Sequence, residues 1–429
     1  MLSANPYGPL VVIGNPRTPF VQRPAQYWRR QGIDTIIVTA RLGVPGGQLE
    51  DGTPVLDAAA DVPPAVREEL GLVGELLGGL EAELDVLAAA QHGAAVSAWG
   101  EDKPLPSIVP VVADAVAISR TVRRLHPRAV FGQEVFCYGL ATALCHGVPR
   151  ALMIWGGDID IFAESNPLNL ALTRYALRSV ETVFAGSETV ASKARERFGV
   201  PAGRVHPFSF GIDRSRFHRP GPAERSRIRQ GLGLPADAAV VLNLRRLDPL
   251  WGADVVVAAG LRLLRERPDA ALVLPGGIGN DERCETTRRL FEAAGLLDRV
   301  RILSGDLSLD RYAELLKAAD VGLALAQWPE PRSMSVTQGM ACGLPLVLAD
   351  HPVWRDVQAL GGDADLVPPA DVDAVVGAVA SLLADARRRD TLVNAGLAYV
   401  ARHEDEAREL DRLRRLVENQ PGEALTRPA

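Results

Sequence analysis

Short apolar runs alternate with longer helical patterns along most of the chain. PLVVIGNP (9–16) and DTIIVTA (34–40) read as strands, and FVQRPAQYWRRQG (20–32) between them reads as a helix. Further strands are predicted at 129–133, 151–155 and 182–187, and helices at 63–91 and 107–125, where apolar positions recur three and four residues apart. Such alternation predicts parallel sheets covered by helices on both faces.

The alternation resumes after residues 206–224, a Pro-, Gly- and polar-rich stretch without a clear period, which we interpret as the interdomain region. Strands are predicted beyond it at 239–246, 270–277, 299–305, 321–327 and 345–350, and helices at 252–265, 283–295 and 309–318. The chain is therefore expected to hold two tandem doubly wound α/β domains. We place the first at 1–209, completed by a charged helix at 404–418, and the second at 210–403.

Folds of this class bind ligands at the carboxyl ends of their strands. With two such domains facing each other, we expect the site in the cleft between them. A chain of 429 residues is long enough for two domains, and its 47% hydrophobic and 23% charged residues are typical of a soluble globular protein. The net charge of −6 argues against a nucleic-acid binder.

The N-terminal stretch MLSANPYGPLVVIGNP lacks a basic region and a long apolar core, so we interpret it as a first strand rather than a signal peptide. No apolar run approaches the ~20 residues of a membrane helix, which predicts a cytoplasmic protein without stable membrane insertion. The cysteines show no CxxC spacing and are expected to be reduced, mostly buried thiols; they are Cys137, Cys145, Cys284 and Cys342.

Four motifs in the second half follow one another in a recognisable order. They are FGID-x3-F (210–217), RRL-x4-G (245–252), VLPGGIGNDE (273–282) and E-x7-Q followed by GMACGLP (330–345). Together they resemble the retaining GT-B glycosyltransferases of family 4, the glycogen-synthase-like group 1. In the first half, IWGGDIDIF (154–162) and residues 173–194 are similar to a WGSD-bearing branch of that family, whereas residues 1–130 match only in outline.

The resemblance implies a GT-B fold, two Rossmann-like domains that act on a nucleotide-diphosphate sugar and transfer its sugar with retention of configuration. No metal or other cofactor is expected. UDP or GDP is the expected nucleotide, and a small molecule or a glycan the acceptor. The leaving phosphate itself takes the acceptor proton in this chemistry, so positioning and electrostatic support matter more than a nucleophile. A homodimer is left open.

The resemblance assigns Glu330 to the donor-sugar hydroxyls, since a carboxylate accepts hydrogen bonds only. The alternative is an acid that the helix dipole stabilises. Ser333, Met334 and Ser335 open the following helix, where backbone N–H groups would face the diphosphate. Plain capping by Ser333 is compatible with that role.

Two positions depart from the family. Gln338 stands where a second Glu usually binds the ribose, and an amide keeps one acceptor oxygen but loses the charge. Arg246 matches a diphosphate-binding Arg, but Trp251 replaces the Lys that normally follows. We hypothesise that Arg332 supplies the missing charge, the alternative being a solvated surface arginine. Trp251 would then stack on a sugar, base or acceptor, or pack at the domain edge.

Three glycines are predicted to let the backbone approach the donor closely: Gly211, Gly276 and Gly277. GGIGND is not a GxGxxG motif, because Glu282 occupies the last position, and this argues against a dehydrogenase.

In the first domain, Asp158 and Asp160 form a DxD sequence that could bind a metal, but its setting at a strand end favours a turn that lines the cleft. We predict Asp158 near the reacting sugar or the acceptor, with Arg246 and Glu330 as the other catalytic residues; an Asx turn or helix cap is its alternative. Acceptor contacts are predicted for Arg17, Trp155, Gly156 and Gly157.

The leading interpretation is thus a retaining glycosyltransferase. A second is a non-catalytic homologue whose donor site has decayed at Trp251 and Gln338. A third keeps the activity and explains both changes by an unusual sugar or acceptor in natural-product biosynthesis.

Overall fold

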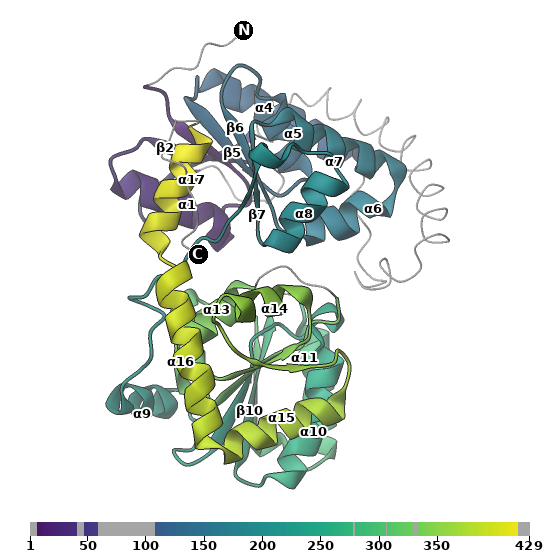
Figure 1. The fold of residues 1–429 in the computed structure, drawn as a ribbon, viewed down its shortest axis with the longest axis vertical. Coiled ribbons are helices and arrows are strands. Elements are labelled where there is room, and N and C mark those ends of the chain that lie inside the picture. Colours follow the sequence, from purple (N-terminus) through teal and green to yellow (C-terminus); the bar gives the residue numbers. More distant parts are fainter. Residues whose placement is uncertain are drawn as a thin grey trace. The chain divides into compact units, whose positions relative to one another are not determined.

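The computed structural model describes residues 7–40, 47–58, 108–277, 279–305, 307–328 and 333–418. The chain divides into two units, one of residues 1–210 with 407–429 and one of residues 211–406 (Figure 1). Each unit is built around a mostly or wholly parallel sheet with helices on its faces, so the predicted doubly wound α/β class is confirmed. The helix predicted at 63–91 lies outside the described residues.

The first unit holds an 8-stranded sheet in the order β3-β4-β2-β1-β5-β6-β7-β8, parallel except for the β3–β4 pair. Its strands are β1 (Leu10–Ile13), β2 (Thr35–Thr39), β3 (Gly47–Gln48), β4 (Pro54–Asp57), β5 (Ala129–Gln133), β6 (Arg150–Ile154), β7 (Thr182–Ala185) and β8 (Val205–Pro207). Its helices include α1 (Pro19–Arg30), α4 (Ile108–Arg124), α5 (Cys137–Leu144), α6 (Ala163–Ser165), α7 (Pro167–Ser179) and α8 (Glu188–Glu196).

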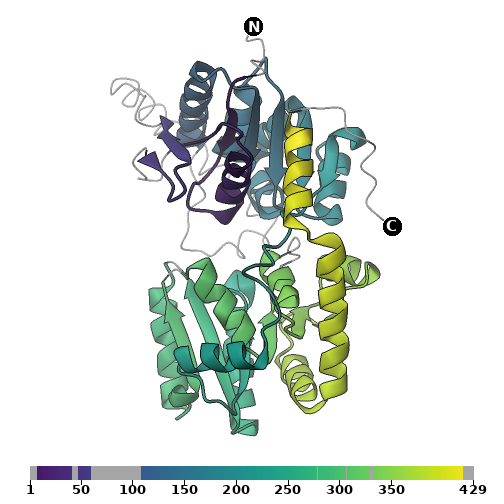
Figure 2. The ribbon, with the colours of Figure 1, turned by 90° about the vertical axis from the view of Figure 1, so that its left-hand side faces the viewer.

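The last described helix, α17 (Glu406–Val417), packs on the first unit beside α1 (Figures 1 and 2). Its contacts run along the helix: the indole Nε1 of fully buried Trp28 donates to the carbonyl of Leu410 at 3.4 Å. Arg412 donates to the carbonyl of Pro207 at 3.2 Å. The apolar stripe that does the packing is Leu410, Leu413 and Val417, all buried. A segment nearly 400 residues from α1 in sequence thus completes the same unit.

The second unit holds a 6-stranded, wholly parallel sheet in the order β11-β10-β9-β12-β13-β14. Its strands are β9 (Ala239–Asn243), β10 (Ala270–Gly277), β11 (Val300–Ser304), β12 (Val321–Ala324), β13 (Leu346–Ala349) and β14 (Asp365–Val367). Its helices are α9 (Pro222–Gly231), α10 (Ala253–Glu266), α11 (Asp281–Ala293), α12 (Leu309–Ala318), α13 (Met334–Ala341), α14 (Pro352–Ala359), α15 (Val372–Ala384) and α16 (Ala386–His403).

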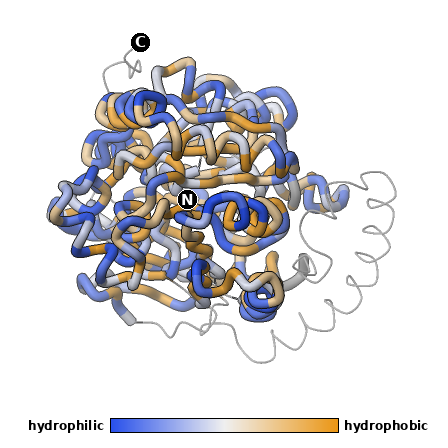
Figure 3. The backbone as a smooth tube through the Cα atoms, turned by 90° about the horizontal axis from the view of Figure 1, so that it is seen from below, coloured by the Kyte–Doolittle hydropathy of each residue, from blue (hydrophilic) through white to orange (hydrophobic). Residues whose placement is uncertain are grey.

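Apolar side chains fill both faces of this second sheet. One buried cluster joins β9 and β12 to α12 and α13 through residues such as Leu242 and Val336, and another joins them to α10 and α15 through residues such as Val241 and Val256. Strands buried on both faces read as continuous apolar runs, which is why AVVLN and VGLA showed no alternation. Figure 3, coloured by hydropathy, shows many of the hydrophilic segments on the outer turns.

Several predicted elements match the observed ones residue for residue: β5, β10 and α12. The short strands β3, β4, β8 and β14 were missed, since runs of two to four residues carry little periodicity. All four cysteines are free thiols, three of them buried, which confirms the expectation for them. Within the described ranges, no helix is long and apolar enough to cross a bilayer.

Replacing Leu410 with Ala should destabilise the first unit by about 2–5 kcal/mol, because the side chain is fully buried and its loss leaves a cavity. Leu416→Ala, on the same helix but only partly buried, is the matched control and should cost distinctly less. Chemical unfolding followed by circular dichroism measures both. Equal losses for the two variants would contradict the packing of α17 described above.

Candidate functional site

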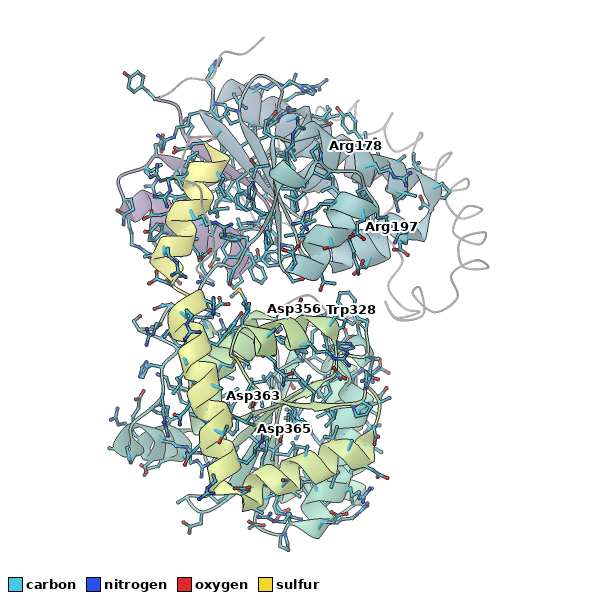
Figure 4. The ribbon with its side chains drawn as sticks, in the orientation of Figure 1. Arg178, Arg197, Trp328, Asp356, Asp363 and Asp365 are labelled. Atoms are coloured by element: carbon cyan, nitrogen blue, oxygen red, sulfur yellow. The ribbon has the colours of Figure 1, made fainter. Side chains whose placement is uncertain are left out.

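The strand order of the second sheet reverses between β9 and β12, and doubly wound sheets bind ligands outside the carboxyl ends of strands at such a point. Arg245 and Arg246 follow β9, and Trp328 follows β12 at the end of the unit that carries α13 (Figures 1 and 4). The two connections touch. The backbone N–H of Gln327 donates to the carbonyl of Leu250 at 3.0 Å. A Cβ on Gly252 would lie 1.9 Å from the carbonyl oxygen of Leu325.

Arg246 lies at this strand end with its side chain 48% exposed, and its guanidinium approaches the Asp248 carboxylate at 3.4 Å. The glycine of the neighbouring strand makes room for it. Gly277 has φ +81° and a Cβ there would sit 2.6 Å from the Arg246 Cβ. An exposed, loosely paired arginine at the reversal point is free to bind an anion.

The other two predicted glycines have clear packing reasons. A Cβ on Gly276 would lie 2.3 Å from the Sγ of Cys284, so the strand passes close to α11 there. Gly211 has φ +68°, and a Cβ there would lie 2.5 Å from the backbone of Glu406, where the chain enters and leaves the second unit. These contacts account for both glycines without a ligand, and a donor contact at either stays a prediction.

Trp251 ends a short turn, η4 (Pro249–Trp251), that Asp248 begins by accepting a hydrogen bond from the amide of Leu250. The guanidinium of Arg245 lies over the Trp251 ring, 4.0 Å from its centroid. Trp328 meets the same ring edge-on, with centroids 5.9 Å apart. Trp251 therefore packs between an arginine and a second tryptophan, a neighbourhood that the sequence did not indicate.

Helix α13 lies within the last predicted motif, and Tyr312 links the first turn of this helix to the end of β9. Ser333 occupies its N-cap position and is buried, yet its side chain makes no capping hydrogen bond and instead pairs with the Ser335 hydroxyl at 2.7 Å. The capping alternative is therefore not what the structure shows. The side chain of Met334 is partly buried. The first N–H groups of a helix lack intrahelical acceptors, which suits an anion.

The remaining donor-site predictions divide in two. Gln338 lies on α13 with only 6% of its surface exposed, so a ligand would meet little more than the edge of this side chain. Glu330 and Arg332 lie outside the described residues, and their roles stay predictions.

In the first unit the strand order reverses between β1 and β5. Arg17 follows β1 with an exposed side chain, and its backbone amide donates to Asn15 at 2.9 Å. Trp155 follows β6, which β5 separates from β1 in the sheet. Its ring packs against Phe20 of α1, with ring centroids 4.2 Å apart, and against Phe210 at 5.6 Å. The structure therefore brings the predicted acceptor residues to one end of this sheet, around an aromatic cluster.

Asp158 is buried and opens a short π-helical turn, η2 (Asp158–Phe162). Its carboxylate accepts backbone hydrogen bonds from Trp155 at 3.0 Å, Gly156 at 2.9 Å and Val135 at 3.3 Å. Gly156, with φ +104°, and Gly157 form the turn that these bonds hold. The geometry is that of the Asx-type alternative: the side chain organises the turn. Burial raises the pKa of Asp158 to about 6 despite those bonds.

Asp160, the second acid of the DxD sequence, forms an ion pair instead. Asp160 binds the ammonium of Lys193 through both oxygens, at 2.7 and 2.8 Å. Across the part of the chain that the structure describes, no three His, Cys, Asp or Glu side chains gather as a metal site would require.

Sequence reasoning missed Glu134, which follows β5 directly at the reversal point. Its φ of +74° places a non-glycine residue in the left-handed region, a conformation that costs about 1–3 kcal/mol and is concentrated at functional sites. Burial, and to a lesser extent the neighbouring Asp158, raise the pKa of Glu134 to about 7. The only available signal was an acid immediately after a buried apolar strand.

Residues 224–398 match the family model of glycosyl transferases group 1. A D-inositol 3-phosphate glycosyltransferase 2 of Catenulispora acidiphila is 30% identical over 211 residues, 48% of each chain. A GDP-mannose-dependent alpha-(1-6)-phosphatidylinositol monomannoside mannosyltransferase of Mycobacterium tuberculosis is 28% identical over 370 residues, 81% of this chain and 93% of the other. The chain spans about half the length of the D-inositol 3-phosphate glycosyltransferases that it matches.

The fold is also that of solved structures. Anabaena HepE, solved in complex with UDP and glucose, superposes with a TM-score of 0.69 at 15% identity, over 95% of this chain and 99% of that chain. The likeness establishes the GT-B fold, with its two Rossmann-like parallel sheets.

Replacing Gly277 with Ala should cost about 2–4 kcal/mol of stability, since a left-handed backbone penalty adds to a clash with Arg246. Gly279→Ala is the matched control, because Gly279 has φ +75° but nothing within 4 Å of an added Cβ. It should lose only the backbone part, about 1–2 kcal/mol. Urea unfolding compares the two, and equal costs would disprove the close approach to Arg246.

Replacing Glu134 with Gln should change how stability depends on pH. Because the folded-state pKa of Glu134 is raised to about 7 from 4.5, its contribution is fully present below pH 4.5 and is lost as the pH rises through 7. The wild type should therefore lose stability relative to Glu134→Gln between pH 4.5 and 7, on the order of 2 kcal/mol. Thermal unfolding across this range measures it. Glu196→Gln, an exposed acid of the same unit, should run parallel to the wild type; parallel curves for all three proteins would refute the assignment.

Proposed function

We propose that this chain, which carries a glycosyl transferases group 1 domain at residues 224–398, moves a sugar from a nucleotide diphosphate to an acceptor hydroxyl with retention of configuration. One observation carries the proposal. Arg246 lies where the strand order of the 6-stranded parallel sheet reverses, inside the matched segment. Gly277 has no Cβ and therefore leaves room for the Arg246 side chain. A cation there, close in the fold to the start of α13, is suited to a diphosphate.

The roles of the donor residues follow from their chemistry. Arg246 would pair with the diphosphate, because a guanidinium offers two parallel N–H donors to phosphate oxygens. The amides at Ser333, Met334 and Ser335 would bind the same group at the positive end of the α13 dipole. Glu330 would hold the sugar hydroxyls. The small exposed edge of Gln338 would accept from the ribose with its amide oxygen.

In the proposed reaction the bond between the sugar anomeric carbon and the phosphate oxygen breaks, and the acceptor oxygen forms its bond on the same face. The acceptor proton passes to the departing phosphate oxygen, so the nucleoside diphosphate leaves with the bonding pair. No protein nucleophile takes part. The protein supplies orientation and the positive charge that stabilises the departing phosphate.

We assign the acceptor to the first unit. Trp155 offers an aromatic face for a sugar or cyclitol ring, and exposed Arg17 offers a cation for a phosphate on the acceptor. Asp158 acts through the turn that it holds rather than by direct contact. Two of the similar proteins are named for activity on inositol 3-phosphate and on phosphatidylinositol monomannoside, which supports a small polyol acceptor. A natural-product acceptor is the narrower possibility that the sequence suggested.

No metal is assigned to the reaction, and UDP or GDP is the nucleotide we favour. The matched mannosyltransferase named as GDP-mannose-dependent supports GDP. The alternative, a non-catalytic homologue with a decayed donor site, draws on the changes at Trp251 and Gln338. Arg246 speaks against this alternative, because its side chain is exposed at the strand end and Gly277 leaves room for it.

Calorimetric titration with UDP, GDP, ADP and TDP in turn tests the proposal. One of them should bind, and Arg246→Ala should weaken that binding about 10- to 100-fold, because a charge-assisted contact contributes about 1.5–3 kcal/mol. Transfer from the matching nucleotide sugar is then followed by NMR of the anomeric proton, with and without EDTA. Binding of none of the four by folded protein would favour the non-catalytic alternative. An inverted product would contradict retention, and loss of transfer in EDTA would contradict the metal-free assignment.

A further inference from the structure

Arg245 is held more firmly than its neighbour Arg246. Its guanidinium lies 4.0 Å from the centroid of the Trp251 ring, and that ring is in turn packed edge-on by Trp328. Arg245 itself is only partly exposed, whereas the Arg246 side chain is 48% exposed. An arginine stacked on an aromatic ring that is itself packed in place has lost most of its rotamer freedom before a ligand binds.

The surroundings of Arg245 disfavour its charge. Burial is the main cause that lowers its pKa, to about 10, and the neighbouring Arg246 lowers it further. The repulsion between Arg245 and Arg246 is a cost that an anion bound by both residues would offset. With a pKa of about 10, Arg245 nevertheless remains charged at neutral pH.

The same residues connect to the start of α13. The hydroxyl of Tyr312 donates to the carbonyl of Leu244, the residue before Arg245, at 3.1 Å. That hydroxyl also interacts with the Ser335 side chain and with the charge of Arg245. Ser335 in turn pairs with Ser333 at the helix N-cap. Tyr312 thus links the end of β9, which carries Arg245, to the N-terminus of α13.

We infer that Arg245, oriented by the face of Trp251, is a second phosphate-binding cation of the donor site, acting beside Arg246 on the diphosphate of a nucleoside diphosphate. The inference rests on the proposed function. It gives Trp251 the task of holding a cation, in place of the sugar or base stacking that the sequence suggested. It also supplies the positive charge that Arg332 was expected to provide.

The test measures affinity for the nucleoside diphosphate that the wild type binds best among UDP, GDP, ADP and TDP, and for the matching monophosphate. Arg245→Ala should weaken diphosphate binding about 10- to 100-fold and monophosphate binding clearly less, because the lost contact is to the added phosphate. Arg245→Lys keeps the charge but not the planar stack, so it should fall between. Arg301→Ala is the matched control. It removes a partly exposed arginine near the amino end of β11, which donates to the carbonyl of Asp298, and should leave both affinities unchanged.

Two further variants separate a charge effect from a structural one. Trp251→Phe keeps an aromatic face under the guanidinium and should retain most of the affinity, whereas Trp251→Ala should lose much of what Arg245→Ala loses. In the double variant Arg245→Ala with Trp251→Lys, an ammonium returns to the same place and should restore at least 5-fold of the lost diphosphate affinity. A purely structural role for Arg245 would give no such rescue. Thermal unfolding verifies that each variant is folded.

The outcomes distinguish the two claims. If the wild type binds a diphosphate and folded Arg245→Ala binds it equally well, the inference fails and the proposed function stands. If Arg245→Ala weakens diphosphate and monophosphate to the same extent and Trp251→Lys does not rescue, Arg245 is structural and the inference also fails. If the wild type binds none of UDP, GDP, ADP and TDP, the proposed function fails, and the inference fails with it.

Discussion

The candidate donor site depends on the pairing of β9 with a different strand on each side. Past the end of β9, the amide of Leu244 still bonds to β12, donating to the carbonyl of Leu323 at 2.8 Å. Three residues later the amide of Leu247 bonds to β10 instead, donating to the carbonyl of Gly276 at 3.1 Å. Arg245 and Arg246 lie between these two anchors. The chain crosses from one neighbour to the other in those residues, and their side chains are therefore presented where the strand order reverses.

The features around that crossing follow from it. Gly277, at the end of β10, must make room for Arg246, and Gly252 must make room for the carbonyl of Leu325 beyond β12. Trp251 is placed by the turn between those contacts and meets Arg245. The same end of the sheet receives the N-terminus of α13, so cations and a helix dipole of the same sign gather there. A positive potential at this end of the sheet favours a bound anion, which is the physical basis of the proposed function.

Much of this architecture could be predicted from sequence because it rests on local signals. Buried parallel strands such as β10 are continuous apolar runs, and α12 has a clear helical period. Arg246 and Gly277 could be found because motif spacing places them at strand ends. Arg245 was missed because its significance comes from a contact across six residues with Trp251, and an arginine beside a motif arginine carries no signal of its own.

The first unit shows the limits of sequence reasoning more sharply. Asp158 was predicted near the reacting sugar or the acceptor, with an Asx-type turn as the alternative, and three backbone amides donate to its carboxylate. Glu134, which no motif marked, combines a left-handed backbone with a raised pKa at the reversal point of the first sheet. Burial and backbone conformation are properties of the folded chain, and the pattern of a single sequence does not reveal them. Acids that shape a turn and acids that face a ligand therefore look alike in sequence.

The central claim is that nucleotide binds at the carboxyl ends of β9 and β12, and hydrogen–deuterium exchange with and without the nucleotide that binds tests it most directly. The account predicts slower exchange in peptides covering residues 244–252 and 333–340, with little change at 234–239 and 298–301, near the opposite ends of the strands. Saturating nucleotide that protects only those opposite ends, or only the first unit, would contradict it.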